Sequence, residues 1–212
     1  MIDCITASDA HRYADALHQM YQRRYDVFVK RRGWSALARE DGIEKDQFDT
    51  ENAIYLLNIR EDGFVDGGLR LLPTTGPHLL SELFPHFVAG DVPRGLGIYE
   101  MTRCFTIRDS AQKNRMRYVA GELLCAMFEY CLDNGGEWIT TMLDTFYVHR
   151  MRDNHWNEVL LGPPTKYDEG TAVAAKFAVT EGNLKATQLA HGVFWRALRD
   201  VSPIEENLQN AA

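Results

Sequence analysis

Apolar positions along the chain alternate between strand-like and helix-like periods. Runs that suit strands cover residues 1–5, 53–60, 64–72, 97–107, 138–143, 159–161 and 173–179, and runs that suit helices cover 8–31, 114–132, 146–154 and 181–199. Glu61-Asp62-Gly63 separates two of the strand runs and predicts a hairpin. Strands that lead into helices on a mixed sheet favour an α/β sandwich.

Two segments do not follow these periods. Residues 33–52 form a polar connection that is longer than most loops in compact domains, and loops of that length are usually functional or mobile. For residues 79–87 the sequence predicts a short helical or irregular segment. The chain has no repeat, low-complexity tract or linker, so we expect one domain over residues 1–212.

The helix predicted over 8–31 carries an arginine on its apolar face. Ser8 and Asp9 suit its N-cap. The buried stripe is expected to contain Tyr13, Leu17, Met20 or Tyr21, Arg24 and Phe28. Charged groups are rarely buried without a partner, so the arginine needs a counter-charge.

The polar loop offers the nearest counter-charges in sequence, Asp46 and Asp49, and Trp34 stands at its start. With Arg24 and Phe28, these residues suggest a clamp for a zwitterionic small molecule, made of a cation, an aromatic wall and two anions. Each residue alone also has a structural interpretation, as a solvated arginine, a core aromatic or an aspartate that caps a turn.

Composition and charge exclude several classes of protein. A chain of 212 residues can bury a substantial core. No apolar run reaches about 18 residues, so we expect no membrane span, and the N-terminus MIDCITASDAH does not resemble a signal peptide. The net charge of −7 argues against nucleic acid as the partner.

Cofactor, metal and disulfide motifs are missing from the sequence. The seven histidines show no metal-ligand spacing, and no Walker, Rossmann or GxSxG pattern is present. The four cysteines form no CxxC pair, which fits reduced thiols in a cytoplasm better than a disulfide framework. We therefore expect a cytoplasmic protein with neither a metal nor a cofactor.

Five short segments resemble the LuxI-type acyl-homoserine lactone synthases, the autoinducer synthases of quorum sensing. They read RYDVFVKRRGW (24–34), EKDQFD (44–49), GGLRLLP (67–73), SELFP (81–85) and YEMTRCF (99–105). The positions that match the family pattern in order are Arg24, Phe28, Trp34, Asp46, Asp49, Arg70, Glu100 and Arg103. The resemblance is dense in the first half of the chain and looser in the second.

The resemblance implies both a fold and a reaction. The fold would be a GNAT-like three-layer α-β-α sandwich around a mixed, mostly antiparallel sheet. Its strands containing Glu100 and Trp138 would splay apart to admit the pantetheine arm of a thioester. The enzyme would transfer an acyl group from acyl-CoA or acyl-carrier protein to the amine of the substrate S-adenosylmethionine. The methionyl carboxylate would then displace methylthioadenosine and close the lactone.

The resemblance also assigns roles to side chains. Glu100 would take the proton of the substrate ammonium, or else pair with Arg70 or Arg103 to hold the site in shape, and both interpretations stay open. Arg103 and Arg24 would bind the substrate carboxylate, while Arg70 would tie the carboxylates together. The positively charged and adenine parts of S-adenosylmethionine would face the remaining members of the set, which are Asp46, Asp49, Phe28 and Trp34.

One pair of candidates poses a geometric problem. Glu100 and Arg103 lie three residues apart on one predicted strand, so a regular strand would direct them to opposite faces. If both serve one site, the strand needs a bulge or a strong twist. We predict such an irregularity near residues 100–103.

An acyl chain needs an apolar tunnel. Its candidate lining residues, each of which could instead be plain core, are Phe84, Met101, Phe105, Leu123, Met127, Met142, Phe146, Tyr147 and Trp156. The DTFY segment (144–147) resembles the branch of the family that takes branched or aryl acyl-CoA donors, so it favours acyl-CoA over acyl-carrier protein. A basic cluster could meet a carrier protein or CoA phosphates, or could be a solvated face; it comprises Lys113, Arg115, Arg117, Arg150 and Arg152.

Two other functions compete with this one. The chain could be a GNAT-like N-acyltransferase with a different amine acceptor, but RDSAQKNR (108–115) lacks the glycines of the usual pyrophosphate loop. It could also be a non-catalytic protein that binds S-adenosylmethionine or a thioester. The intact set of matched polar residues disfavours that second alternative.

Overall fold

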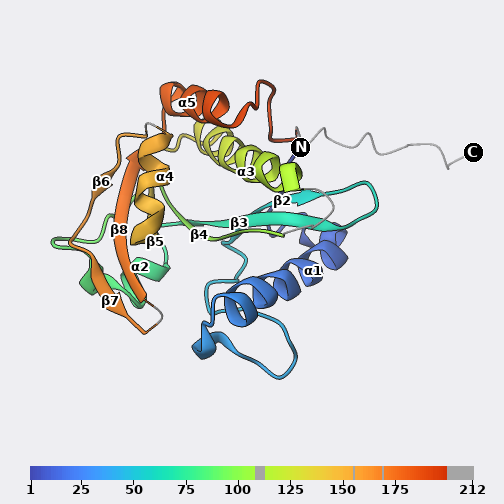
Figure 1. Cartoon of the computed structure of the whole chain (residues 1–212), viewed down its shortest axis with the longest axis horizontal. Coiled ribbons are helices and arrows are strands. Elements are labelled where there is room, and N and C mark those ends of the chain that lie inside the picture. Colours follow the sequence, from blue (N-terminus) through green and yellow to red (C-terminus); the bar gives the residue numbers. More distant parts are fainter. Residues whose placement is uncertain (108–112, 155, 169, 200–212) are drawn as a thin grey trace, which may run out of the picture.

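The protein is built around one extended sheet, which we describe from a computed structural model covering residues 1–107, 113–154, 156–168 and 170–199 (Figure 1). The strand order is β1-β2-β3-β4-β5-β8-β6, and β7 also pairs with β8. The strands are β1 (Asp3–Ile5), β2 (Ile54–Ile59), β3 (Val65–Pro73), β4 (Ile98–Thr106), β5 (Trp138–Asp144), β6 (Val159–Leu160), β7 (Thr165–Tyr167) and β8 (Gly170–Ala178).

Helices cover both faces of this sheet. In Figure 1, α3 and α5 lie on one side and α1 on the other, which gives three layers. The α-helices are α1 (Ala14–Arg24), α2 (Leu79–Glu82), α3 (Lys113–Asp133), α4 (Val148–Asp153) and α5 (Glu181–His191). Shorter helical segments are η1 (Ala10–Tyr13), η2 (Tyr25–Arg31), η3 (Ser35–Leu37), η4 (Pro85–Phe87) and η5 (Thr145–Tyr147).

The sheet is mixed and mostly antiparallel, as predicted. Among the described strands, β4 and β5 pair in parallel, while the other strand pairs are antiparallel. The predicted hairpin is the β2–β3 pair. The described part of the chain contains no helix with the length and apolar character needed to cross a membrane.

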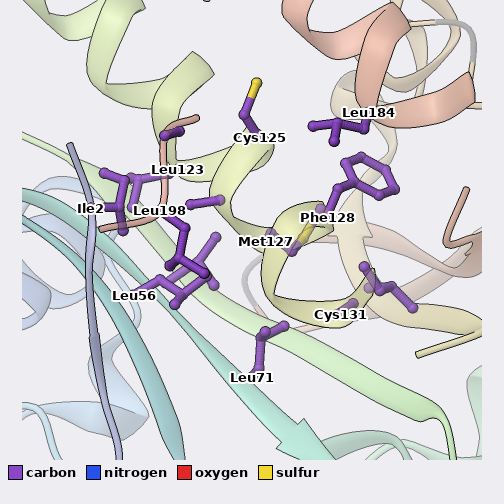
Figure 2. Packing of buried hydrophobic residues seen from close by; sticks show 14 of the residues in the cluster. Ile2, Leu56, Leu71, Leu123, Cys125, Met127, Phe128, Cys131, Leu184 and Leu198 are labelled. Carbon is purple, nitrogen blue, oxygen red and sulfur yellow. The ribbon is translucent and has the colours of Figure 1, made fainter. Parts of the chain in front are cut away.

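Alternation along β2 and β3 divides the core into two parts. Leu56 and Leu71 belong to the cluster beneath α3, which also contains Leu123 and Met127 of that helix (Figure 2). Their neighbours Leu57 and Leu72 belong to the cluster that α1 covers. Both clusters are buried because successive side chains of a central strand point to opposite faces.

The helical run from Ala10 to Arg31 confirms the predicted first helix, with two differences. Asp9 precedes the run, but its side chain caps no backbone N–H. The last part, η2, is π-helical, and the N–H of Arg32 donates to the carbonyl of Val27, five residues earlier. Such wide turns insert a residue into a helix and are frequent at functional sites.

The prediction for the C-terminal helix was wrong in length. The sequence predicted a helix over residues 181–199, but α5 ends at His191. Gly192 adopts φ +70° there and its N–H closes the last turn on the carbonyl of Gln188, which is the usual glycine C-cap. The segment beyond Gly192 returns to the first strand, where Ile2 bridges Leu198. Strand β7 was not predicted.

Strand β4 carries the predicted irregularity. Gly68 and Arg70 of β3 face Phe105 and Thr102, so three steps on β4 oppose two on β3. Arg103 lies inside this bulge with φ +53°, which is uncommon for a residue other than glycine. The bulge resets the alternation, and the side chains of Glu100 and Arg103 reach the same layer.

Strands β4 and β5 separate beyond their first residues. Their pairing runs from Ile98–Trp138 to Met101–Thr141. The strands themselves continue to Thr106 and Asp144. The predicted divergence of these two strands is therefore present.

Gly67, in the GGLRLLP segment, lets α3 approach the sheet. A Cβ atom there would lie 2.8 Å from the carbonyl oxygen of Phe105 and 2.9 Å from Cγ1 of Val119 on α3. Both distances are shorter than normal carbon contacts. Since one neighbour is backbone, the site cannot open by a side-chain rotation alone.

We predict that Gly67→Ala lowers the free energy of unfolding by about 1–3 kcal/mol, because overpacking shifts α3 or β4. Urea unfolding of the purified protein measures this change. Gly182→Ala on α5 is the control, since its nearest non-neighbouring atom is Oγ1 of Thr180 at 3.6 Å. Equal stability of the two variants would contradict the packing argument.

Candidate functional site

Arg24 is buried beneath the polar loop and is fully paired with carboxylates. Its Nε atom donates to Glu44 at 2.5 Å, and its Nη1 and Nη2 atoms donate to Asp49 at 2.8 and 3.0 Å. The side chain is 1% exposed. The expected counter-charge is therefore present in Asp49, while the contribution of Glu44 was missed.

Arg70 joins the two aspartates of the loop. Its Nη1 and Nη2 atoms form a bidentate pair with Asp46 at 2.6 and 3.0 Å, and Nη1 also lies 2.8 Å from Asp49. Its Nε atom donates to Oγ1 of Thr102 on the neighbouring strand. This arrangement agrees with the tying role predicted for Arg70.

Arg103 completes the arrangement from the bulge in β4. It donates to both oxygens of Glu44 at 3.1–3.2 Å and to Asp46 at 2.8 Å. We call these six residues the ion-pair cluster: Arg24, Glu44, Asp46, Asp49, Arg70 and Arg103. Arg103 and Asp46 are its more accessible members, at 7% and 14% exposure.

The charges of the ion-pair cluster balance, with three guanidinium groups and three carboxylates. Burial alone would raise the pKa of Asp49, but the charges of Arg24 and Arg70 and their hydrogen bonds hold that pKa well below its usual range. The hydroxyl of Tyr55 also donates to Asp49, at 2.8 Å. Asp49 is thus a permanently ionised, fully bonded member.

The loop that carries these carboxylates is folded around them. The N–H of Asp46 donates to Asp49 and the N–H of Phe48 donates to Asp46. The N–H of Glu44 donates to the carbonyl of Tyr21 and so ties the loop to α1. The long polar connection is therefore fixed where it meets the arginines.

A cavity of about 270 Å³ adjoins the accessible side of the ion-pair cluster. Glu44, Asp46 and Arg103 line it on one side. The rest of its wall is formed by residues 36–39 of the polar loop and by Lys45, Gln47, Phe48 and Leu83. A small zwitterion in this cavity would meet a cation and an anion close together.

Phe28 and Trp34 form a stacked pair beside Arg103. Their ring centroids lie 4.9 Å apart with an interplanar angle of 19°. The guanidinium carbon of Arg103 lies 5.7 Å from the Phe28 centroid and 5.8 Å from the Trp34 centroid. Phe28 is buried in the core, whereas Trp34 is half-buried.

Glu100 is fully buried on β4 and binds backbone. Its two carboxylate oxygens accept the N–H groups of Leu79 at 2.7 Å and Leu80 at 2.8 Å. The alternative of an ion pair with Arg70 or Arg103 is thus replaced by hydrogen bonds to α2. Burial raises the pKa of Glu100 to about 7, although these N–H groups and the two arginines oppose the shift.

The predicted acyl-lining residues divide between the two faces of the sheet. Phe84, Phe105 and Met142 pack with the cluster on the α1 side. The cluster beneath α3 contains Met101, Leu123, Met127 and Trp156. An acyl chain that touches both groups must pass between the separating strands, so their shared role stays a prediction.

The remaining candidates lie near the end of β5 or outside the described residues. Phe146 is exposed and stacks on Tyr147 with centroids 4.1 Å apart. Arg152 is exposed and pairs with Glu158 at 2.9 Å. The segment 108–112 and the side chains of the other basic-cluster members lie outside the described residues; these are Lys113, Arg115, Arg117 and Arg150.

Sequence reasoning missed Glu44 and Tyr55. Glu44 begins the EKDQFD segment, where an acidic residue beside two recognised aspartates was a usable signal. Tyr55 had no such signal, because it lies within a hydrophobic strand. Across the described residues, no group of three or more His, Cys, Asp or Glu is placed to share a metal ion.

Residues 8–187 match the family model described as autoinducer synthase, and this span includes the whole ion-pair cluster, the bulge and Glu100. The chain belongs to the autoinducer synthase family. Its sequence is also similar to the isovaleryl-homoserine lactone synthase of Bradyrhizobium diazoefficiens. The two are 36% identical over 176 residues, which cover 82% of this chain and 78% of that enzyme.

This autoinducer synthase also resembles solved structures. One is the CoA-dependent acyl-homoserine lactone synthase BjaI with SAM and isopentyl-CoA, at a TM-score of 0.86 and 32% identity, covering 94% of this chain and 92% of that one. Another is the CoA-dependent synthase MesI, at 0.84 and 36% identity, covering 94% and 100%.

The GNAT-like fold expected for this autoinducer synthase is confirmed by a more distant likeness. A Lactobacillus plantarum protein named as an N-acetyltransferase superposes with a TM-score of 0.57 at 18% identity, over 84% of this chain and 99% of that one. At that identity the likeness concerns the fold alone.

We predict that Glu44→Gln costs about 3–5 kcal/mol of unfolding free energy, because it leaves Arg24 and Arg103 with a buried charge that is no longer balanced. Urea unfolding measures the loss. Glu40→Gln, an exposed carboxylate on the same loop, is the matched control and should change little. A Glu44→Gln protein as stable as the control would show that the cluster is not a stabilising unit.

Proposed function

We propose that this autoinducer synthase makes an acyl-homoserine lactone from S-adenosylmethionine and an acyl-CoA, with residues 1–212 acting as one catalytic domain. The observation that carries the proposal is the convergence of two distant segments. Asp46 and Asp49 of the polar loop meet Arg70 and Arg103 of β3 and β4 beside a cavity. Arg103, which lines the cavity, comes from the same strand as the buried acid Glu100, and this strand separates from β5 after Met101.

In this proposal the cavity holds the methionyl part of S-adenosylmethionine. Arg103 would bind the carboxylate, since a guanidinium can grip it with two hydrogen bonds. Asp46 would face the amine or the sulfonium, and Trp34 would offer its face to the sulfonium or the adenine. Arg24, Asp49 and Arg70 are saturated by bonds within and around the ion-pair cluster, so we assign them the role of holding Arg103 and Asp46 in place.

Glu100 is our candidate base for the first step. The amine attacks the thioester carbonyl only after its ammonium has lost a proton. A carboxyl with a pKa of about 7 is well matched to that task near neutral pH. The N–H groups of Leu79 and Leu80 leave lone pairs on the carboxylate that can accept the proton, directly or through one water.

The thioester would enter where β4 and β5 separate. Phe84, Phe105 and Met142 are the lining candidates on the same face as Glu100. Met101, Leu123, Met127 and Trp156 would be reached by a chain that passes between the strands, and Phe146 and Tyr147 stand at the end of β5. We favour CoA over a carrier protein because the similar enzymes of known donor are CoA-dependent.

A cytoplasmic location follows from the same proposal. S-adenosylmethionine and acyl-CoA are cytoplasmic metabolites. All four cysteines are free in the structure, which suits a reducing compartment. The alternatives, an N-acyltransferase with another amine acceptor or a non-catalytic binder, predict respectively a different acceptor and no turnover.

The deciding assay uses the purified chain with S-adenosylmethionine and a panel of linear, branched and aryl acyl-CoAs and acyl-carrier proteins. We expect methylthioadenosine release and an acyl-homoserine lactone of the matching mass, fastest with an acyl-CoA. Acylation of another amine without methylthioadenosine would favour the general acyltransferase. Tight binding without any product would favour the non-catalytic alternative.

The pH profile tests the base. Because a base acts when deprotonated, kcat/KM should rise as pH increases through about 7 and level off above it, following the pKa of Glu100. Glu100→Gln should lower kcat by about 100-fold or more. The substrate ammonium titrates in a nearby pH range, so the pH profile of Glu100→Gln is the control. In that variant, the rise of kcat/KM near pH 7 should be absent. An unchanged rate and profile in a folded variant would remove Glu100 from the mechanism.

A further inference from the structure

Arg32 lies at the end of η2 and packs against the aromatic pair. Its guanidinium carbon is 5.8 Å from the Phe28 centroid and 5.4 Å from the Trp34 centroid. Trp34 is the residue that we place against S-adenosylmethionine. One side of Arg32 therefore contacts the wall of the proposed methionyl-donor site.

The other side of Arg32 reaches the end of β5. Its Nη2 atom donates to the hydroxyl of Tyr147 at 3.0 Å, and its Nη1 atom lies 3.5 Å from Oδ2 of Asp144. The second oxygen of Asp144 accepts the hydroxyl of Tyr167 at 2.7 Å. Arg32 thus connects the N-terminal helical run to side chains at the end of β5.

This connection reaches β5 beyond the place where its pairing with β4 ends. The β4–β5 pairing ends at Met101–Thr141, three residues before Asp144. Beyond that point the backbone ladder no longer joins β5 to β4, while Arg32 joins the end of β5 to the helical run that follows α1. Arg32 and Asp144 are 25% and 18% exposed, and ion pairs that water can reach are weak enough to open and close.

We propose that Arg32 is a positioning residue that couples the two substrate sites. When S-adenosylmethionine orders Trp34, Arg32 is held against Asp144 and Tyr147, and the end of β5 is set for the thioester. By reciprocity, a bound thioester favours the ordered aromatic pair. The inference rests on the proposed function, because it assigns the two walls to those two substrates.

The experiment measures the affinity for an alkyl-CoA thioether, isopentyl-CoA, by calorimetry with and without saturating S-adenosylmethionine. The thioether has no thioester carbonyl, so no acyl transfer disturbs the measurement. In the unaltered protein we expect S-adenosylmethionine to tighten thioether binding about 5-fold or more. Arg32→Ala and Asp144→Asn should each bring this factor close to one, while both ligands still bind.

Lys30→Ala is the matched control, because Lys30 is a cation of the same helical run that pairs with exposed Asp26 and contacts Tyr25. It should keep the full factor. The proposal would be overturned if S-adenosylmethionine did not tighten isopentyl-CoA binding in the unaltered protein, or if it tightened binding equally in Arg32→Ala. If Arg32→Ala does not fold, Asp144→Asn on β5 gives the same comparison. Failure of the unaltered protein to bind either ligand would instead refute the proposed function.

Discussion

The ion-pair cluster is the interaction on which the site depends. Three buried guanidinium groups would be prohibitively costly alone, and three buried carboxylates equally so. Placed together their charges cancel, and each guanidinium group contacts two of the three carboxylates. The arginines come from α1, β3 and β4, whereas all three carboxylates come from one loop. Electrostatic balance therefore fixes a long polar segment onto the sheet at a defined place.

The ion-pair cluster has an inner part, which is almost fully covered, and an outer part, which lines the cavity. Arg24, Asp49 and Arg70 are almost fully covered, and their charged groups bond within the ion-pair cluster. Arg103 and Asp46 keep some exposure and line the cavity. A ligand with both charges can add to the outer pair without disturbing the inner residues. The inner residues supply rigidity, and the outer pair supplies recognition.

Much of the fold could be predicted from the chain, since strands and helices follow the period of apolar residues. The irregularity near Arg103 was also predictable, because two candidate site residues had the wrong spacing for a regular strand. The pKa of Glu100 was not predictable: sequence suggested arginine partners that would lower it, whereas full burial of the carboxyl raises it. The contact of Arg32 with Tyr147 joins residues 115 positions apart, and no local pattern signals it.

The π-helical turn between Tyr25 and Arg31 gives the chain an unusual sensitivity to length. An ordinary α-helix turns by about 100° per residue, so the wide turn sets the direction in which Arg32 and Trp34 emerge relative to Arg24. One residue fewer in this stretch would leave every functional side chain in the sequence but rotate Arg32 and Trp34 relative to Arg24. The number of residues between Arg24 and Trp34 is therefore a structural requirement of the site, separate from the identities of the residues between them.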